Sequence, residues 1–200
     1  MIGWLSVASL EGIAQDRTHK GFYLSMQIGP TFGQINGNTN IDYSLTVKGP
    51  AYGFDIVLGG TPMENLVVHG TIGYKSIYNP EIEDFNGSHT IDQAEFDEVM
   101  MGAGVTYYFK NNFLVSSTLG LGNFTLYDEI ENSDVRTDVG FSYQVKVGKE
   151  WWISPRWALG GVLEYAGTRA GYSEWDYEET WQSHRFSVRF TATMHGRKGD

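Results

Sequence analysis

Hydrophobic and polar residues alternate with a period of two in eight separate segments of this 200-residue chain. Successive side chains of a β-strand point to opposite faces, so each segment is predicted to be a strand with one apolar and one small or polar face. The predicted strands span residues 21–33, 51–59, 66–75, 98–109, 113–122, 139–148, 157–166 and 183–194. Their order and spacing predict an all-β, eight-stranded, antiparallel up-and-down barrel.

The second face decides whether such a barrel is soluble or crosses a membrane. Segment 139–148 shows the pattern most sharply, with Val139, Phe141, Tyr143, Val145 and Val147 alternating with Gly140, Ser142, Gln144, Lys146 and Gly148. A soluble, lipocalin-like ligand-binding barrel would carry Lys, Glu and Thr over its outside, whereas here the second face is mainly small residues. Small residues fit a narrow lumen, so the apolar face is predicted to contact lipid. The soluble barrel is kept as an alternative.

Seven charged residues fall on the predicted lumen face. They are Asp55, Glu98, Glu164, Lys75, Lys146, Arg185 and Arg189. Buried charges are tolerated when they are paired and hydrogen-bonded. We therefore expect an internal salt-bridge network in a lumen filled by side chains, with glycines leaving room for the long residues. His69 also falls on this face and is interpreted as a packed lumen residue.

Segment lengths and aromatic residues agree with a membrane-spanning barrel. A tilted transmembrane strand needs about 9–11 residues, and aromatic girdles are expected at both interfaces. One group of aromatic residues lies near the short connections: Phe109, Phe113, Trp151, Trp152 and Trp157. A second group lies toward the long connections: Tyr52, Tyr74, Tyr78, Tyr127 and Tyr165.

The connections alternate in length and predict a barrel with one elaborated end. The short ones lie near 60–65, 110–112 and 149–156, and the long ones near 34–48, 79–97, 128–136 and 168–181. In bacterial outer-membrane barrels the short turns face the periplasm and the long loops face outside. The long connections are rich in acids, so we expect acidic extracellular loops.

Composition bounds the remaining possibilities. We expect an N-terminal tail or signal-peptide remnant over 1–20, one barrel domain over 21–195 and a polar tail over 196–200. Cysteine is absent, which excludes disulfides and thiolate chemistry, and the net charge of −10 argues against a nucleic-acid partner.

Few residues are candidates for a catalytic or metal-binding role. Ser183 and His184 are neighbours on one strand and so point to opposite faces, and Ser88 and His89 lie in a polar loop. Residues 83–87 faintly resemble the opening of a calcium loop, but the spacing and the closing Glu are wrong. We therefore assign no catalytic, cofactor-binding or metal residue, no cofactor and no enzymatic activity.

The chain resembles the small eight-stranded outer-membrane barrels of the OmpA-like and OmpX-like class, including uncharacterised outer-membrane β-barrel domains. GFYLSMQIG at 21–29, GAGVTYYF at 102–109 and GKEWWISPRWALG at 148–160 carry the resemblance. One departure is that the last strand continues past Phe190 to His195 and a polar tail, where this class usually ends on an aromatic residue read by the assembly machinery.

The resemblance implies a place in the outer membrane of a Gram-negative cell envelope. Expected partners are outer-membrane lipid and lipopolysaccharide, the barrel assembly machinery during biogenesis, and an extracellular ligand that the sequence leaves unidentified; we expect a monomer. Our leading hypothesis is a barrel with a structural or surface-interaction role. A second hypothesis, a lipid-modifying enzyme, would require Ser, His and an acid to converge at the outer rim.

Overall fold

A computed structural model of the chain describes residues 19–39, 44–85, 87–128, 133–174 and 177–196. Eight strands form its wall. They are β1 (Gly21–Thr39), β3 (Ala51–Met63), β4 (Leu66–Tyr78), β7 (Ala94–Tyr108), β8 (Phe113–Asp128), β10 (Gly140–Trp152), β11 (Trp157–Glu174) and β12 (Tyr177–His195). The predicted tail at 1–20 and polar tail at 196–200 lie mostly outside the described residues. No helix among the described residues is long and apolar enough to cross a membrane.

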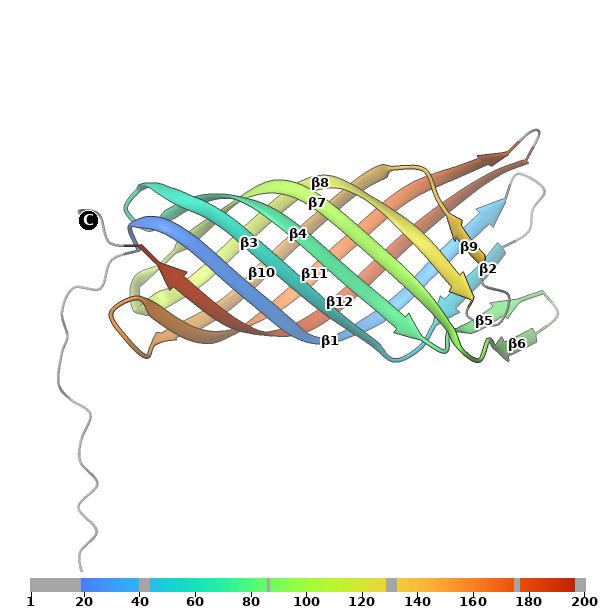
Figure 1. The fold of residues 1–200 in the computed structure, drawn as a ribbon, viewed down its shortest axis with the longest axis horizontal. Coiled ribbons are helices and arrows are strands. Elements are labelled where there is room, and N and C mark those ends of the chain that lie inside the picture. The colour runs from blue at the N-terminus through green and yellow to red at the C-terminus, as the bar shows by residue number, and fades with distance from the viewer. Residues whose placement is uncertain (1–18, 40–43, 86, 129–132, 175–176, 197–200) are drawn as a thin grey trace, which may run out of the picture.

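The wall is a closed antiparallel barrel. Each strand pairs with the next one of the wall, and β12 pairs back onto β1, where Met26 lies opposite Ala192. Residues 19–21 and 195–196 lie at the same end as the tight turns at 64–65, 110–112 and 153–156; we call this the terminal end and the opposite one the distal end (Figure 1). Asn65 and Asn111 have a φ of 65° in two of these turns, a left-handed conformation that Asn tolerates.

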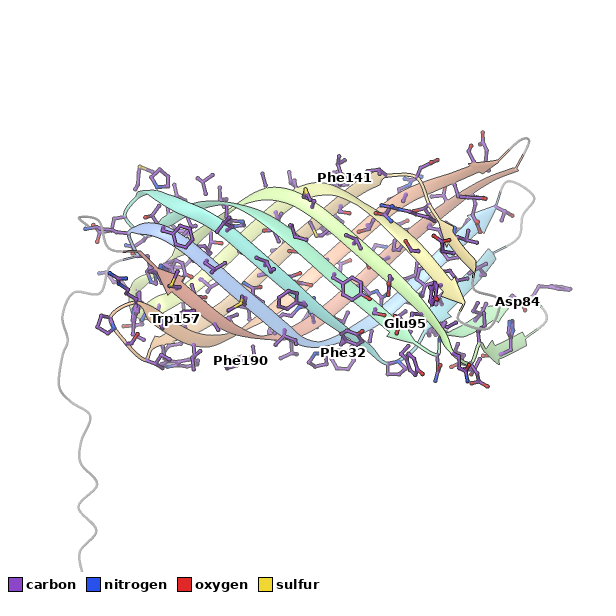
Figure 2. All side chains as sticks on the ribbon, viewed as in Figure 1. Phe32, Asp84, Glu95, Phe141, Trp157 and Phe190 are labelled. Atoms are coloured by element: carbon purple, nitrogen blue, oxygen red, sulfur yellow. The ribbon has the colours of Figure 1, made fainter. Side chains whose placement is uncertain are left out.

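All eight predicted faces are confirmed. Apolar residues assigned to lipid point outward, as Phe32, Phe141 and Phe190 do in Figure 2. Their partners on the second face, such as Ser25, Gln144 and the seven predicted lumen charges, are buried. A soluble barrel with its apolar face inside is therefore wrong for this chain.

The predicted long connections are mostly β-structure. The wall strands continue into them, and four short strands complete the distal end: β2 (Ser44–Lys48), β5 (Glu81–Asp84), β6 (Gly87–Thr90) and β9 (Ser133–Arg136). β2 pairs with β1 and β5, β6 with β5, and β9 with β8 (Figure 1). The elaborated end is thus a distal extension of the barrel rather than a set of long loops.

The polarity of the two faces inverts in this distal extension. On β1, Gln34 and Asn38 face outward while Ile35 is fully buried, and on β7 Glu95 faces outward while Phe96 is buried. Each face must match its surroundings. Apolar residues therefore face outward where the strands contact lipid and inward where the strands contact water. The extension therefore has the surface of a soluble barrel.

Candidate functional site

The centre of the lumen holds a cluster of ion pairs, all fully or almost fully buried. The Lys146 ammonium lies 2.7 Å from an Asp55 oxygen and 3.2 Å from a Glu164 oxygen. Glu164 also lies 3.1 Å from the Arg189 guanidinium and 3.7 Å from the Lys75 ammonium. These groups come from five strands: β3, β4, β10, β11 and β12. The cluster therefore links opposite sides of the barrel.

A second ion pair lies beside this cluster. Arg185 Nε is 3.5 Å from Glu98 Oε2, and the other Glu98 oxygen accepts hydrogen bonds from the hydroxyls of Thr168 at 2.7 Å and Ser183 at 2.9 Å. The predicted network is confirmed, with every one of the seven predicted residues in an ion pair. Its carboxylates are held by hydrogen bonds as well as by charge, as buried charges require.

Glycines make the room that these long side chains occupy. A Cβ on Gly53 would lie 2.1 Å from the Arg189 guanidinium, and a Cβ on Gly73 would lie 2.6 Å from an Asp55 oxygen. Both distances are well inside van der Waals contact. The lumen is therefore filled by side chains at its centre, as the sequence predicts.

Two apolar clusters bracket the charged centre. The cluster toward the terminal end contains Tyr23, Val57, Val67, Tyr108, Leu114 and Val162. The cluster toward the distal end contains Ile35, Val47, Ile77, Phe96, Phe124 and Ala170. Apolar surroundings on both sides lower the local dielectric and strengthen each ion pair between them.

The terminal end of the lumen is closed by residues that the sequence analysis did not assign. Glu150 is buried and accepts hydrogen bonds from the hydroxyls of Tyr108 at 3.0 Å and Thr193 at 2.6 Å. Trp152, predicted to join the lipid girdle, instead points inward, with its ring 5.2 Å from that of His19. With Glu150 included, the described residues contain four buried acidic and four buried basic side chains.

His19 plugs this end from the segment that precedes β1. Its ring stacks on Tyr108 at 3.6 Å, its Nε2 donates to Asn112 Oδ1 at 3.2 Å, and its Nδ1 accepts from His195 Nε2 at 3.2 Å. An amide oxygen can only accept, so neutral His19 carries its proton on Nε2. Its Nδ1 is then the acceptor, and neutral His195 carries its proton on Nε2. Burial lowers the pKa of His19 from 6.5 to about 4.

The distal mouth contains an apolar pocket of about 110 Å³. Its lining comes from β7, β8, β9, β11 and β12 and includes Phe96, Phe124, Val135, Tyr172, Glu179 and Trp181. Glu179 is the acid at this pocket, and burial raises the pKa of its carboxyl group. The pocket continues the distal apolar cluster to the surface.

Exposed acidic residues also lie at this end of the barrel. Glu81, Glu83, Asp134 and Glu178 are exposed on the distal strands, and Figure 2 shows Asp84 and Glu95 at the same end. Lys48 pairs with Glu83, and this hydrogen bond raises the pKa of the lysine. Several acids of the later connections, including Glu129, Glu131 and Asp176, lie outside the described residues.

The Ser and His pairs named by the sequence do not converge. Ser183 is buried and bonded to Glu98, whereas His184 is exposed on the outer wall, with its Nδ1 3.0 Å from the Tyr165 hydroxyl. Ser88 and His89 lie exposed on β6, where the Ser88 hydroxyl donates to Glu81. His69, expected to be a packed lumen residue, is buried and lies 3.1 Å from the hydroxyls of Thr71 and Thr106.

Possible metal ligands do not cluster within the described parts of the chain, where no group of three His, Asp or Glu side chains is placed to hold an ion. In the segment that faintly resembles a calcium loop, Glu83 and Asp84 lie at the end of β5 and Gly87 begins β6. Asn86 of the same segment lies outside the described residues.

Comparison with known proteins adds evidence on the fold. No protein-family model matches the chain, and no curated protein matches it. Among solved structures, Neisserial surface protein A matches with a TM-score of 0.55 and 13% identity, over 88% of this chain and 97% of that one. OprG, an outer-membrane protein from Pseudomonas aeruginosa, matches with a TM-score of 0.55 and 10% identity, over 90% and 99%.

This chain has the fold of the small outer-membrane barrels. The closed wall, the apolar outer face and both structural matches agree on this point. They support the bacterial outer membrane as the location of the protein. At 10–13% identity the matches concern the fold, and the function has to be argued from this chain's own residues.

Proposed function

We propose that the protein is a non-enzymatic outer-membrane barrel whose distal extension binds a cationic, partly apolar polypeptide at the cell surface. The observation that carries this proposal is the combination found at the distal mouth. An apolar pocket that includes Phe124 and Trp181 opens there, and Glu81, Glu83 and Glu178 are exposed on strands at the same end of the barrel. Such a surface fits a partner that inserts an apolar side chain and presents basic residues around it.

The orientation follows from the rule for bacterial barrels of this kind, in which short turns and both termini lie in the periplasm. The tight turns and residues 19 and 196 share the terminal end, so the distal extension projects outside. The inverted polarity of the extension supports this placement, because its outward face is polar and suits water.

The interior supports a scaffold role rather than transport. Ion pairs cross the centre of the lumen, and apolar clusters bracket them on both sides. Catalysis by a Ser–His–acid cluster finds no support in the described residues, since Ser183 and His184 point to opposite sides of the wall. The barrel interior is therefore packed with ion pairs and apolar side chains, and the features suited to a partner lie at the distal mouth.

A binding assay tests the proposal. The barrel is placed in nanodiscs of zwitterionic lipid, and binding of a fluorescent Lys-rich, Trp-containing peptide is compared with that of a Glu-rich counterpart across a range of salt concentrations. Combined Glu81→Gln, Glu83→Gln and Glu178→Gln should weaken binding and flatten its salt dependence. Trp181→Ala should weaken binding while leaving the salt dependence in place.

The matched control is Glu64→Gln, which removes an exposed acid at the terminal end, where Glu64 pairs with Lys20. It should leave binding unchanged. Equal binding of both peptides, or equal loss in the control and the distal variant, would contradict the proposal. Release of fatty acid from outer-membrane lipid by the purified barrel would support the lipid-modifying enzyme instead.

A further inference from the structure

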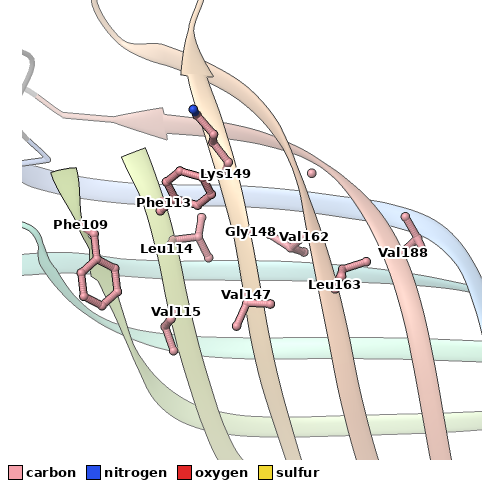
Figure 3. Close-up of a pocket in the computed structure, with 11 residues that line it drawn as sticks. Phe109, Phe113, Leu114, Val115, Val147, Gly148, Lys149, Val162, Leu163 and Val188 are labelled. Atoms are coloured by element: carbon pink, nitrogen blue, oxygen red, sulfur yellow. The ribbon is translucent and has the colours of Figure 1, made fainter. Parts of the chain in front are cut away.

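The lipid-facing wall is hollowed on one side near the terminal end. This groove has a volume of about 590 Å³ and crosses β8, β10, β11 and β12. Figure 3 shows its walls, which are apolar except for Lys149. The side chains that shape it include Phe113, Val115, Val147, Lys149, Leu163 and Val188.

A glycine on the outer face creates the hollow. Gly161 on β11 lies opposite Lys149 on β10 and Phe190 on β12. It is exposed on the lipid-facing surface, where these two neighbours carry large side chains. A Cβ on Gly161 would meet nothing closer than the Arg189 carbonyl oxygen at 3.6 Å. A larger residue would therefore fit at this position. The absence of a side chain leaves open volume in the lipid-facing surface.

One cation stands at the rim of this groove. The Lys149 ammonium lies 4.7 Å from the centre of the Phe113 ring and 5.6 Å from that of Trp151. Figure 3 shows the ammonium beyond the apolar walls, toward the end of β10. Among the described residues, no carboxylate lies within 4.0 Å of it. Trp151 and Trp157 mark this level as the aromatic girdle, where lipid headgroups lie.

We propose that this groove is a specific site for one glycerophospholipid with an anionic headgroup. An acyl chain would lie over Gly161 and against the neighbouring row formed by Val147, Leu163 and Val188, and the phosphate would pair with Lys149. The volume is within the range of about 300–1,000 Å³ typical of ligand sites, and a cation beside an apolar slot matches the two halves of a phospholipid. With the orientation argued above, the lipid belongs to the periplasmic leaflet.

The proposal rests on the membrane barrel and not on binding at the distal mouth. The site can be occupied whichever way the barrel is inserted, so its failure and that of the surface role are separate results.

The test reconstitutes the full chain into nanodiscs containing equal parts of phosphatidylglycerol and phosphatidylethanolamine, then counts lipids retained by the released barrel in native mass spectrometry. Wild type should retain one phosphatidylglycerol in preference to phosphatidylethanolamine. Lys149→Gln should lower that preference about fivefold, as expected for one lysine at a membrane surface. Gly161→Leu should abolish retention of either lipid by filling the groove.

Matched controls distinguish the groove from the general belt. Gly70→Leu adds the same side chain to the outer face of β4, four residues from the start of its strand, as Gly161 is on β11. A Cβ on Gly70 has similar room, with its closest neighbour at 3.8 Å. Lys20→Gln removes an equal charge at the same end of the barrel, where Lys20 pairs with Glu64.

Both controls should retain lipid as wild type does, and all variants should show the heat-dependent gel shift of a folded barrel. Retention by Gly161→Leu equal to that of Gly70→Leu would overturn the acyl-chain position. A loss of preference in Lys20→Gln equal to that in Lys149→Gln would overturn the role of Lys149.

Discussion

Replacing Glu164 by Gln should be among the most destabilising single changes in the barrel. Glu164 is fully buried and faces three cations, Arg189 at 3.1 Å, Lys146 at 3.2 Å and Lys75 at 3.7 Å. The substitution keeps the side-chain volume but leaves Asp55 as the acid facing these cations in the central cluster. Removing one partner of a buried ion pair costs about 3–5 kcal/mol. Because Glu164 serves three cations, we expect the upper part of this range.

The magnitude can be checked by a double-mutant cycle. Glu164 is the acid with which Lys75 forms its described salt bridge, so Lys75→Met should remove much of the uncompensated charge left by Glu164→Gln. The double variant should then be about 1–3 kcal/mol more stable than the sum of the single effects predicts. Urea unfolding in detergent, followed by circular dichroism and gel mobility, gives the free energies of unfolding.

Glu178→Gln serves as the control, since that carboxylate is exposed on the distal part of β12. It should change the free energy of unfolding by less than about 0.5 kcal/mol. A Glu164→Gln variant as stable as this control would refute the view that the ion pairs hold the lumen together. Strict additivity in the cycle would refute the coupling between Glu164 and Lys75.

Three further outcomes are expected. Val145→Arg, on the lipid face, should lower the free energy of unfolding in bilayers by about 2–4 kcal/mol, whereas Ser88→Arg on exposed β6 should change it little. The barrel should show no steady conductance in a planar bilayer, and a stable open channel would contradict the filled lumen. Because the pKa of His19 is lowered to about 4, docking of His19 should be complete above about pH 6.5 and weaken as the pH falls toward 4. The difference in tryptophan fluorescence between the chain and its Trp152→Phe variant should follow that change, and a flat difference signal would count against it.

The membrane-spanning part of every strand could be predicted from sequence because lipid imposes one rule on the outer face. Outward residues must be apolar, and inward ones must be small or paired, so the period of two is clean across Val145 and Lys146. The pairing of the lumen charges followed from the cost of burying them alone. Which acid meets which base depends on strand tilt and register, and the sequence pattern does not encode these directly.

On the alternation alone, an arginine at Ser142 on the lumen face should cost less than one at Val145 on the lipid face if the lumen has room for it. Ser142 is fully buried. Its hydroxyl lies 2.7 Å from the Thr168 hydroxyl, and a Cβ on Gly122 would lie 2.3 Å from the same oxygen. An arginine at Ser142 would overpack the interior, because neighbours across the barrel fill the space.

The residues that close the terminal end were missed for a different reason. Residues 149–156 read as one short connection, yet the alternation of the preceding strand continues through Lys146 and Gly148 to Glu150 and Trp152. Following that parity would have assigned both to the lumen. His19 lies before the first strand, where no periodic signal marks it.

The sequence predicts loops in place of the distal extension because the outward residues there are polar. A change from apolar to polar residues on the outward face resembles the end of a strand. The position where the outward face changes character therefore marks the membrane boundary rather than the end of the strand. On β7 the apolar outward positions run from Val99 to Tyr107, and on β12 from Phe186 to Met194, which are nine residues each. Both lengths equal the span of about 9–11 residues that a tilted transmembrane strand needs. The remainder of each strand, from Asp97 and His184 outward, is then a water-exposed barrel with an apolar core of its own, and this is the part of the molecule free to meet a partner.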